Sequence, residues 1–218
     1  MAITICPICG KIPICSVTIY NANLRKQTFD ILPILPTCNI CGSEAEITGC
    51  TNGVKVLLLN GTCGSGKSST AEELVKKHGF HAIDGDCVRQ IQKHKLGPGH
   101  AWENNSPEMM DEISKEIDIL SAMGNKIVIS TVVEPQDLHK YRDIFESKGV
   151  EYRIVLLKPD YDTAVARTQT RTCHTSITPE YWVKYFYDKL ELDDVEMFDN
   201  SSLTVEQSAV GILRSWRV

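Results

Sequence analysis

The sequence predicts a three-layer α/β fold, in which helices cover both faces of a five-stranded parallel sheet and a small β module precedes the sheet. Three observations support this prediction. From Val54 onward, short apolar runs of strand length alternate with segments of helical periodicity. A glycine-rich loop at residues 61–68 joins the first apolar run to the first helical segment. Residues 1–52 differ, because they combine short β-branched stretches with prolines and paired cysteines.

The size and composition of the chain fit one full α/β domain and a small module, and we expect domains at 1–52 and 53–218. Hydrophobic residues make up 42% of the 218 residues, which is enough to form a core. The net charge of −5, with no block of Lys or Arg, disfavours an obligate nucleic-acid binder but allows a local basic site. No apolar stretch approaches the roughly 20 residues of a membrane span, and no signal peptide is evident.

Five apolar runs are the expected strands, and the residues between them have helical periodicity. The strands are Lys55–Leu59, Phe80–Ile83, Lys126–Ser130, Tyr152–Leu157 and Val195–Phe198. The helices are expected at 68–78, 106–123, 135–148, 160–172, 179–190 and 204–215. Pro107 and Pro179 take the first helical position in two of them. Such an alternation implies that ligands collect at the carboxyl ends of the strands, where the glycine-rich loop lies.

A complete G-x-x-x-x-G-K-[ST] motif occupies Gly61, Thr62, Cys63, Gly64, Ser65, Gly66, Lys67 and Ser68, and we expect these residues and Ser69 to line a nucleotide site. Glycines let backbone N–H groups point at phosphate oxygens, and the first turn of the helix adds donors and the positive end of its dipole. Lys67 is expected to reach the β- and γ-phosphates, and the Ser68 hydroxyl to ligate Mg²⁺. A glycine-rich turn with a chance lysine is the alternative, but the strand and helix flanks favour a site for ATP.

Four of the nine cysteines form two matching pairs, Cys6/Cys9 and Cys38/Cys41, each followed by a glycine. Four thiolates give the closed tetrahedral shell of structural zinc, so residues 1–52 are expected to form a zinc-ribbon-like module with four cysteine ligands. Redox dithiols or buried cysteines are the alternatives, and Cys15 and Cys50 could substitute as ligands. Reduced thiols and the use of ATP point to the cytoplasm.

Two carboxylates follow the second expected strand, in Asp84-Gly85-Asp86, and Arg89 comes three residues later. The strand that ends at Ser130 has no carboxylate, whereas motor ATPases and GTPases hold Mg²⁺ with an aspartate there. One carboxylate is expected to orient a magnesium-bound water, and the other to accept or align the proton of an attacking hydroxyl. The alternative is an Asp-Gly turn with a helix-capping aspartate.

Arg167 and Arg171 are four residues apart, so they share one helix face and can both reach a transferring phosphate. The segment that follows, Thr172–Thr178, is expected to close over the phosphate as a loop and to exclude water. A solvated basic face is the alternative for the arginines, and His174 is better explained as a surface loop residue.

Together these motifs resemble the small-molecule P-loop kinases, a group that includes gluconate kinase, shikimate kinase, adenylylsulfate kinase and chloramphenicol phosphotransferase. The resemblance covers roughly residues 54–218. It rests on Gly61–Thr70, Asp84-Gly85-Asp86-x-x-Arg89, the Arg-x-x-x-Arg segment and Phe198-Asp199-Asn200-Ser201. The segment from Ser130-Thr131 to Tyr141-Arg142-Asp143 is similar to the one after the third strand in gluconate kinase-like proteins.

On the nucleotide side, the resemblance implies a P-loop NTPase three-layer fold, with Lys67 and Ser68 on ATP and Mg²⁺. It implies that Arg167 and Arg171 are lid arginines and that Asn200–Leu203 border the adenine.

On the acceptor side, the resemblance implies that Asp84 lies near the metal-bound water, Asp86 binds the acceptor hydroxyl and Arg89 binds another polar group of the acceptor. The chain departs from gluconate kinase because it lacks the histidine-proline segment after the acidic pair. Gln90–Trp102 stands there instead, either as an acceptor-binding insert or as a mobile loop.

The favoured function is an ATP-dependent transfer of the γ-phosphate to a hydroxyl of a small polar metabolite, such as a sugar acid. One alternative is a kinase of nucleic-acid ends or nucleotides, with the cysteine module docking the strand. Another is an ATP-binding interaction module whose zinc ribbon docks a protein partner. Turnover with small hydroxyl compounds, salt-sensitive binding of short DNA or RNA, and tight ATP binding without turnover distinguish the three.

The cysteine pairs predict about one zinc ion per chain, measured by metal analysis of the purified protein. Cys38→Ser should lose the metal and unfold the N-terminal module while leaving ATP binding largely intact. Metal-free full-length protein with four alkylatable thiols would contradict this prediction.

Overall fold

The computed structural model describes residues 3–5, 46–48, 53–89, 105–123, 125–170, 178–190, 194–214 and 216. Several residues singled out from the sequence lie outside these ranges, namely Cys6, Cys9, Cys38, Cys41, Gln90–Trp102, Arg171 and His174.

The central layer is a parallel sheet of five strands, ordered β4-β5-β3-β6-β7. The strands are β3 (Lys55–Asn60), β4 (His81–Asp84), β5 (Lys126–Ser130), β6 (Glu151–Leu157) and β7 (Glu196–Phe198). All four pairings between neighbours are parallel, and the five strand predictions are confirmed to within one residue at each end. The strand that carries the phosphate-binding motif is therefore the central one, where strand order reverses and such folds bind ligands.

The helices between the strands also follow the sequence-based expectations. They are α1 (Lys67–His78), α3 (Pro107–Met123), α4 (Leu138–Ser147), α5 (Tyr161–Thr170), α6 (Glu180–Lys189) and α7 (Val205–Arg214). Two details differ: α4 is preceded by the 3-10 turn η1 (Pro135–Asp137), and Pro179 caps α6 instead of starting it. The helical residues 85–89 were not predicted.

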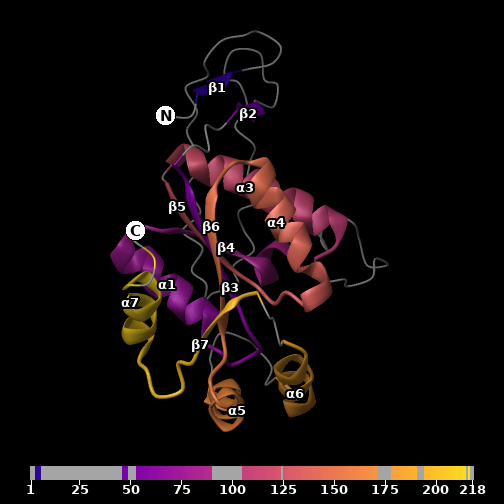
Figure 1. Ribbon diagram of the computed structural model, residues 1–218, viewed down its shortest axis with the longest axis vertical. Coiled ribbons are helices and arrows are strands. Elements are labelled where there is room, and N and C mark those ends of the chain that lie inside the picture. Colours follow the sequence, from indigo (N-terminus) through magenta and orange to yellow (C-terminus); the bar gives the residue numbers. More distant parts are fainter. Residues whose placement is uncertain are drawn as a thin grey trace.

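Alternate residues of β3 point to opposite faces of the sheet and so build two cores. Val56 and Leu58 belong to a cluster with residues of α3 and α4, whereas Leu57 and Leu59 belong to a cluster with residues of α1 and α7. Figure 1 shows the two helix pairs on either side of the strands. The sheet is thus buried on both faces, as its continuous apolar strands predict.

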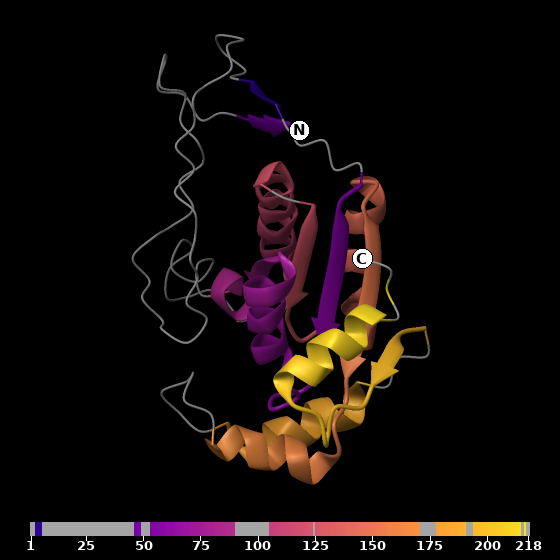
Figure 2. The same ribbon diagram turned by 90° about the vertical axis from the view of Figure 1, so that its left-hand side faces the viewer.

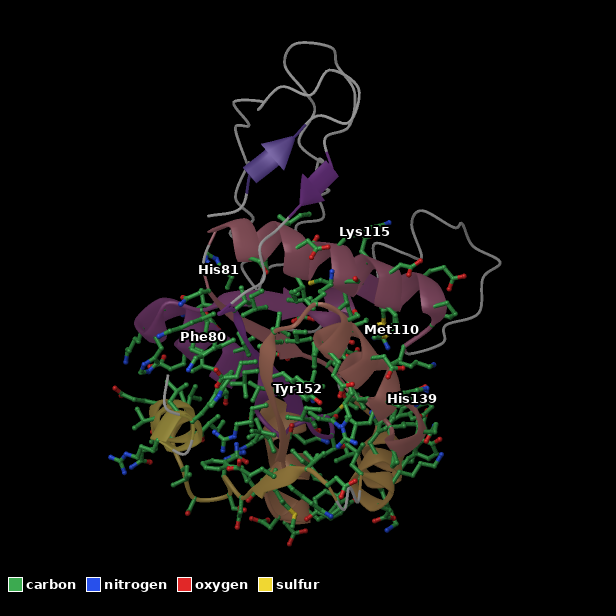
Figure 3. The ribbon with its side chains drawn as sticks, turned by 45° about the horizontal axis from the view of Figure 1, so that its top comes forward. Phe80, His81, Met110, Lys115, His139 and Tyr152 are labelled. Atoms are coloured by element: carbon green, nitrogen blue, oxygen red, sulfur yellow. The ribbon has the colours of Figure 1, made fainter. Side chains whose placement is uncertain are left out.

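Figure 3 labels side chains from both clusters. Met110 of α3 and Tyr152 of β6 lie on one side of the sheet and belong to the α3–α4 cluster. Phe80, just before β4, lies beside α1 and belongs to the other cluster.

The two ends of the sheet carry different structures (Figures 1 and 2). Helices α5 and α6 lie beyond the carboxyl ends of the strands, beside the loop that leaves β3. The short strands β1 (Ile3–Ile5) and β2 (Glu46–Thr48) pair antiparallel and lie beyond the amino ends. Among the described helices, none has the length and apolar character needed to span a bilayer.

Asn105, just before α3, forms hydrogen bonds with the loop after β5, with η1 and with α4. Its buried side chain donates to the Val132 carbonyl oxygen at 3.3 Å and to Asp137 at 3.3 Å, and it accepts from the Tyr141 hydroxyl at 2.8 Å. The Lys140 ammonium donates to its carbonyl oxygen at 3.0 Å. Its φ of 60° is left-handed, a conformation that Asn tolerates better than most residues. The loop after β5 is therefore fastened to α3 and α4 by one side chain.

Substitution of Asn105 separates the two contributions of this residue. Asn105→Gly removes the side-chain hydrogen bonds but keeps the left-handed backbone free of strain, whereas Asn105→Ala loses both. Urea unfolding should give both variants a lower free energy of unfolding than the wild type. The value for Asn105→Ala should be about 1 kcal/mol below that for Asn105→Gly. Equal stabilities of the two variants would contradict a role for the backbone conformation.

Candidate functional site

The phosphate-binding motif forms the turn between β3 and α1, as the sequence predicts. Gly61, Gly64 and Gly66 have φ values of 147°, 80° and 94°, which side chains disfavour. Two of them also lack room for a side chain. A Cβ atom on Gly61 would lie 2.5 Å from the Leu157 carbonyl oxygen, and one on Gly64 would lie 2.1 Å from that of Ala164. The glycines therefore let the loop pack directly against β6 and α5.

Asn60, the last residue of β3, fixes the start of this loop, although it was not predicted as a site residue. Its fully buried side chain accepts hydrogen bonds from the N–H groups of Gly61 at 2.7 Å and Val133 at 2.9 Å, and donates to the Val133 carbonyl oxygen at 2.7 Å. Buried amides are stabilising when fully hydrogen-bonded in this way. A polar residue that ends an otherwise apolar strand was the signal that could have revealed it.

Lys67 and Ser68 begin α1 and lie where the motif requires them. The Lys67 ammonium donates to the carbonyl oxygens of Gly61 at 2.6 Å and Thr62 at 3.0 Å, so its charge lies within the loop. The Ser68 hydroxyl lies 3.4 Å from the hydroxyl of Ser130, the last residue of β5. Ser68 therefore points from β3 towards the half of the sheet formed by β5 and β4.

Asp84-Gly85-Asp86, which we call the acidic turn, lies in that same half of the sheet, at the carboxyl ends of the strands. Asp84 ends β4 and pairs in register with Ser130, which in turn pairs with Leu59 of β3. Its Oδ1 atom accepts hydrogen bonds from the backbone N–H groups of Asp86 at 2.8 Å and Cys87 at 3.2 Å. Asp84 thus caps the helical residues 85–89, so the capping alternative describes this oxygen correctly.

The pKa of the Asp84 carboxyl is raised from 3.8 to about 6. Burial is the main cause, because it penalises the charged form, and the negative charge of Asp86 adds to it. The two backbone N–H groups and the positive charge of Lys67 act in the opposite direction. With this pKa the Asp84 carboxyl is mostly ionised at neutral pH and takes up a proton as the pH falls through about 6.

Asp86 and Arg89 form an ion pair at 2.7 Å on the outer side of this turn. The Asp86 side chain is 59% exposed, and such an ion pair contributes little to stability, so substrate groups can replace it at small cost. Gly85 allows the turn to lie close to the loop after β5, since a Cβ atom there would lie 2.3 Å from the Thr131 hydroxyl. Close packing of Gly85 against the Thr131 side chain therefore helps to set the position of the acidic pair.

Arg167 and Asn200 lie on the opposite side of the phosphate loop. The guanidinium of Arg167 donates to the carbonyl oxygens of Asn200 at 2.8 Å and Ser201 at 3.2 Å. The buried Asn200 amide donates to the Ser65 carbonyl oxygen at 2.9 Å, so this side chain braces the phosphate loop. Gly66 lies beside both, because a Cβ atom there would be 3.3 Å from the Asn200 amide nitrogen.

Helix α6 is attached directly to the phosphate loop. The Thr62 hydroxyl donates to the Val183 carbonyl oxygen at 3.0 Å, and the Val183 side chain is fully buried. This contact was not foreseen, because Thr62 was expected to serve the nucleotide through its backbone.

The structure therefore brings together the phosphate loop, the acidic turn with Arg89, Arg167 and Asn200 at one end of the sheet. It does not describe Arg171, so the second lid arginine stays a prediction. Within the described residues, no group of three or more His, Cys, Asp or Glu could hold a metal ion, and the four predicted zinc ligands lie outside them.

Solved structures share this fold at low sequence identity. The tunicamycin resistance protein of Deinococcus radiodurans has a TM-score of 0.60 and 16% identity, over 74% of this chain and 95% of its own. A gluconokinase of Sinorhizobium meliloti has a TM-score of 0.54 and 20% identity, over 75% and 94%. The APS kinase of Mycobacterium tuberculosis, solved with AMPPNP and APS, has a TM-score of 0.52 and 19% identity, over 76% and 98%.

No curated protein matches the chain significantly. A family model described as an AAA domain matches residues 56–184, which is more than half of the 218 residues. The matched range includes the phosphate loop, the acidic turn, Arg167 and the start of α6. This chain therefore belongs to the AAA domain family that the model describes.

Proposed function

We propose that this protein is an ATP-dependent phosphotransferase that moves the γ-phosphate to a hydroxyl of a small molecule. The observation that carries the proposal is the position of the acidic turn. Asp84 lies in register with Ser130, whose hydroxyl is 3.4 Å from that of Ser68 in the phosphate loop. A carboxylate pair on the strand next to the one whose Ser130 meets Ser68 suits the activation of a hydroxyl that attacks a triphosphate in the loop, whereas hydrolysis by a motor ATPase would call for an aspartate at the end of β5.

The fold similarity supports the same reaction class. The solved neighbours include proteins named gluconokinase and APS kinase, and the second was solved with AMPPNP and APS. At identities near 20% these names suggest a reaction type for this chain and leave its acceptor open.

In this proposal the phosphate loop binds the triphosphate through its backbone N–H groups and Lys67. The acceptor oxygen attacks the γ-phosphorus, the bond to the β–γ bridging oxygen breaks, and ADP leaves. The hydroxyl proton passes to Asp86, and Arg89 aligns the acceptor. Arg167, held by Asn200, would offset phosphate charge from the opposite side.

The chemistry of the donors fits Mg²⁺, because Ser68 and Asp84 offer a hydroxyl and a carboxylate oxygen beside the loop. These two residues would hold the ion, Ser68 directly and Asp84 through water. When bound, it would neutralise charge on the phosphates.

We also propose a structural zinc ion in the N-terminal module. The pairing of β1 with β2 sets Ile5 opposite Glu46 and so brings together the ends of the segment between them. Cys6 follows Ile5 directly, and Cys41 precedes Glu46 by five residues. This closure supports one site of four cysteine ligands, formed from both pairs.

Lys67→Ala should abolish ADP release that depends on hydroxyl acceptors, because the ammonium would bind the phosphates in the transition state. Lys76→Ala is the matched control, since Lys76 is exposed in the last turn of the same helix. Coupled measurement of ADP release from ATP with a panel of hydroxyl compounds tests both variants. The proposal is wrong if no compound raises ADP release above the basal rate in the wild type.

Asp84→Asn separates the charge of Asp84 from its role as a cap, since the asparagine oxygen can still accept the two N–H groups. We expect turnover to fall about 100-fold with little change in Tm. Full activity of the Asn variant would reduce Asp84 to a structural cap.

In the wild type, kcat/KM should fall as the pH drops through about 6, since the raised pKa makes the carboxylate form of Asp84 disappear there instead of near 3.8.

Asp86→Asn should lower kcat far more than it weakens ATP binding, because Asp86 would act on the acceptor. Asp188→Asn is a suitable control, since Asp188 is an exposed carboxylate that also pairs with a cation. Titration calorimetry and steady-state kinetics give the two quantities. Equal losses of ATP affinity and kcat would argue against contact with the acceptor.

A further inference from the structure

One face of α6 carries a group of aromatic side chains that the reaction described above does not use. The helix buries Val183 and Leu190, whereas Trp182 is 43% exposed and Tyr185 is 39% exposed. Together with Phe186 these residues are spaced three and four apart, so they share one face of the helix. We call Trp182, Tyr185 and Phe186 the aromatic face.

The three rings contact one another and form a continuous surface. Trp182 stacks on Phe186 with centroids 5.9 Å apart and an angle of 19° between the planes. Tyr185 lies edge-on to both, at 5.7 Å from Trp182 and 5.0 Å from Phe186. Such mutual packing restricts the rings, so a ligand that stacks on them loses less conformational entropy on binding.

Two contacts place this face on the acceptor side of the site. At its start, α6 is fixed to the phosphate loop through Thr62 and Val183. At its end, Lys189 lies 3.3 Å from Glu134, in the loop that follows β5. Lys189 lies seven residues after Trp182 and so belongs to the same side of the helix. The aromatic face therefore faces the strands that end in Ser130 and Asp84, and not the side of Arg167 and Asn200.

Polar groups border the aromatic face at its end nearest β5. The Lys189 ammonium lies 4.3 Å above the Tyr185 ring and donates to its hydroxyl at 2.5 Å. The Glu134 side chain is 17% exposed and also accepts from Gln136. Ligand sites in proteins commonly combine an apolar or aromatic wall with a few such polar groups.

We propose that the aromatic face binds the acceptor, and that the acceptor carries a planar ring in addition to its reactive hydroxyl. This inference rests on the proposed phosphotransfer function and names the substrate class of the same site. The ring stacks on Trp182 and Tyr185, and Glu134 and Lys189 bind its polar substituents. The hydroxyl then reaches the acidic turn.

The dimensions and charge of the face favour this occupant over a macromolecule. Stable protein interfaces use about 20 to 30 residues on each side, which a cluster of three rings does not approach. A nucleic-acid strand would require a basic groove, but the two charged side chains that border the aromatic face, Glu134 and Lys189, have opposite signs. A single ring matches both the area and the mixed charge.

Matched pairs of acceptors test the proposal. Each pair differs only in the ring, such as an aryl glycoside with its parent sugar and a nucleoside with ribose. We expect the ring-bearing member to have a KM at least about tenfold lower, as stacking on one aromatic side chain supplies. Trp182→Ala should raise that KM about tenfold and leave the KM for ATP unchanged, while Trp182→Phe should retain most of the effect.

Tyr187→Ala is the control variant, because Tyr187 lies on the other side of the same helix, where Lys158 contacts its ring. A binding measurement complements the kinetics: ring-bearing compounds should change tryptophan fluorescence, and Trp182→Phe should lose most of that change. A fluorescence response without turnover would support the binding site and overturn the phosphotransfer function. Equal KM values within each pair, or a Trp182→Ala variant that changes only the oligomeric state, would overturn the acceptor site.

Discussion

The hydrogen bonds of Asn60 are the contact on which the rest of the site depends. This one buried amide joins the end of the central strand, the first residue of the phosphate loop and the backbone of Val133. Because the loop after β5 is fixed in this way, its neighbours acquire fixed positions too. Thr131 sets the position of Gly85, and Glu134 meets the end of α6. The acidic turn and the end of α6 thus have fixed positions relative to β3.

The acidic turn illustrates how one residue can serve both the fold and the chemistry. One oxygen of Asp84 accepts from the N–H groups of Asp86 and Cys87, and that cap orients the turn that carries Asp86 and Arg89. Burial of the carboxyl raises its pKa to about 6, against the effect of these two hydrogen bonds. Capping is therefore compatible with the catalytic role proposed for this residue, although the sequence presents the two as alternatives.

Much of the fold could be predicted from sequence because it depends on local patterns. Apolar runs such as Lys126–Ser130 and the motif that ends in Lys67 and Ser68 specify strands, helices and the loop between them. The packing between segments that are distant in sequence could not be predicted. Asn60 meets Val133 across 73 residues, and Thr62 meets Val183 across 121, and no short pattern encodes such pairs.

The same reason explains why only some contacts of the site residues could be predicted. Asp84 and Arg167 lie at the expected end of the sheet, because strand ends and helix order follow from the pattern. That Asn200 borders the adenine stays a prediction, whereas the hydrogen bond from its amide to the Ser65 carbonyl oxygen was not foreseen, because it depends on how the residues after β7 pack against the phosphate loop. The aromatic residues of α6 looked like ordinary helical residues until Val183 identified the buried side.

The hydrogen bond from Thr62 to Val183 has a thermodynamic consequence. It ties a residue of the phosphate loop to the backbone of the helix that bears the aromatic face. Any compound that shifts α6 must then alter how well the loop holds a nucleotide, and the nucleotide must alter the affinity for that compound by the same factor. Reciprocity makes the two effects equal in size, and the contacts that each bound molecule makes with α6 and the loop decide whether the coupling is favourable.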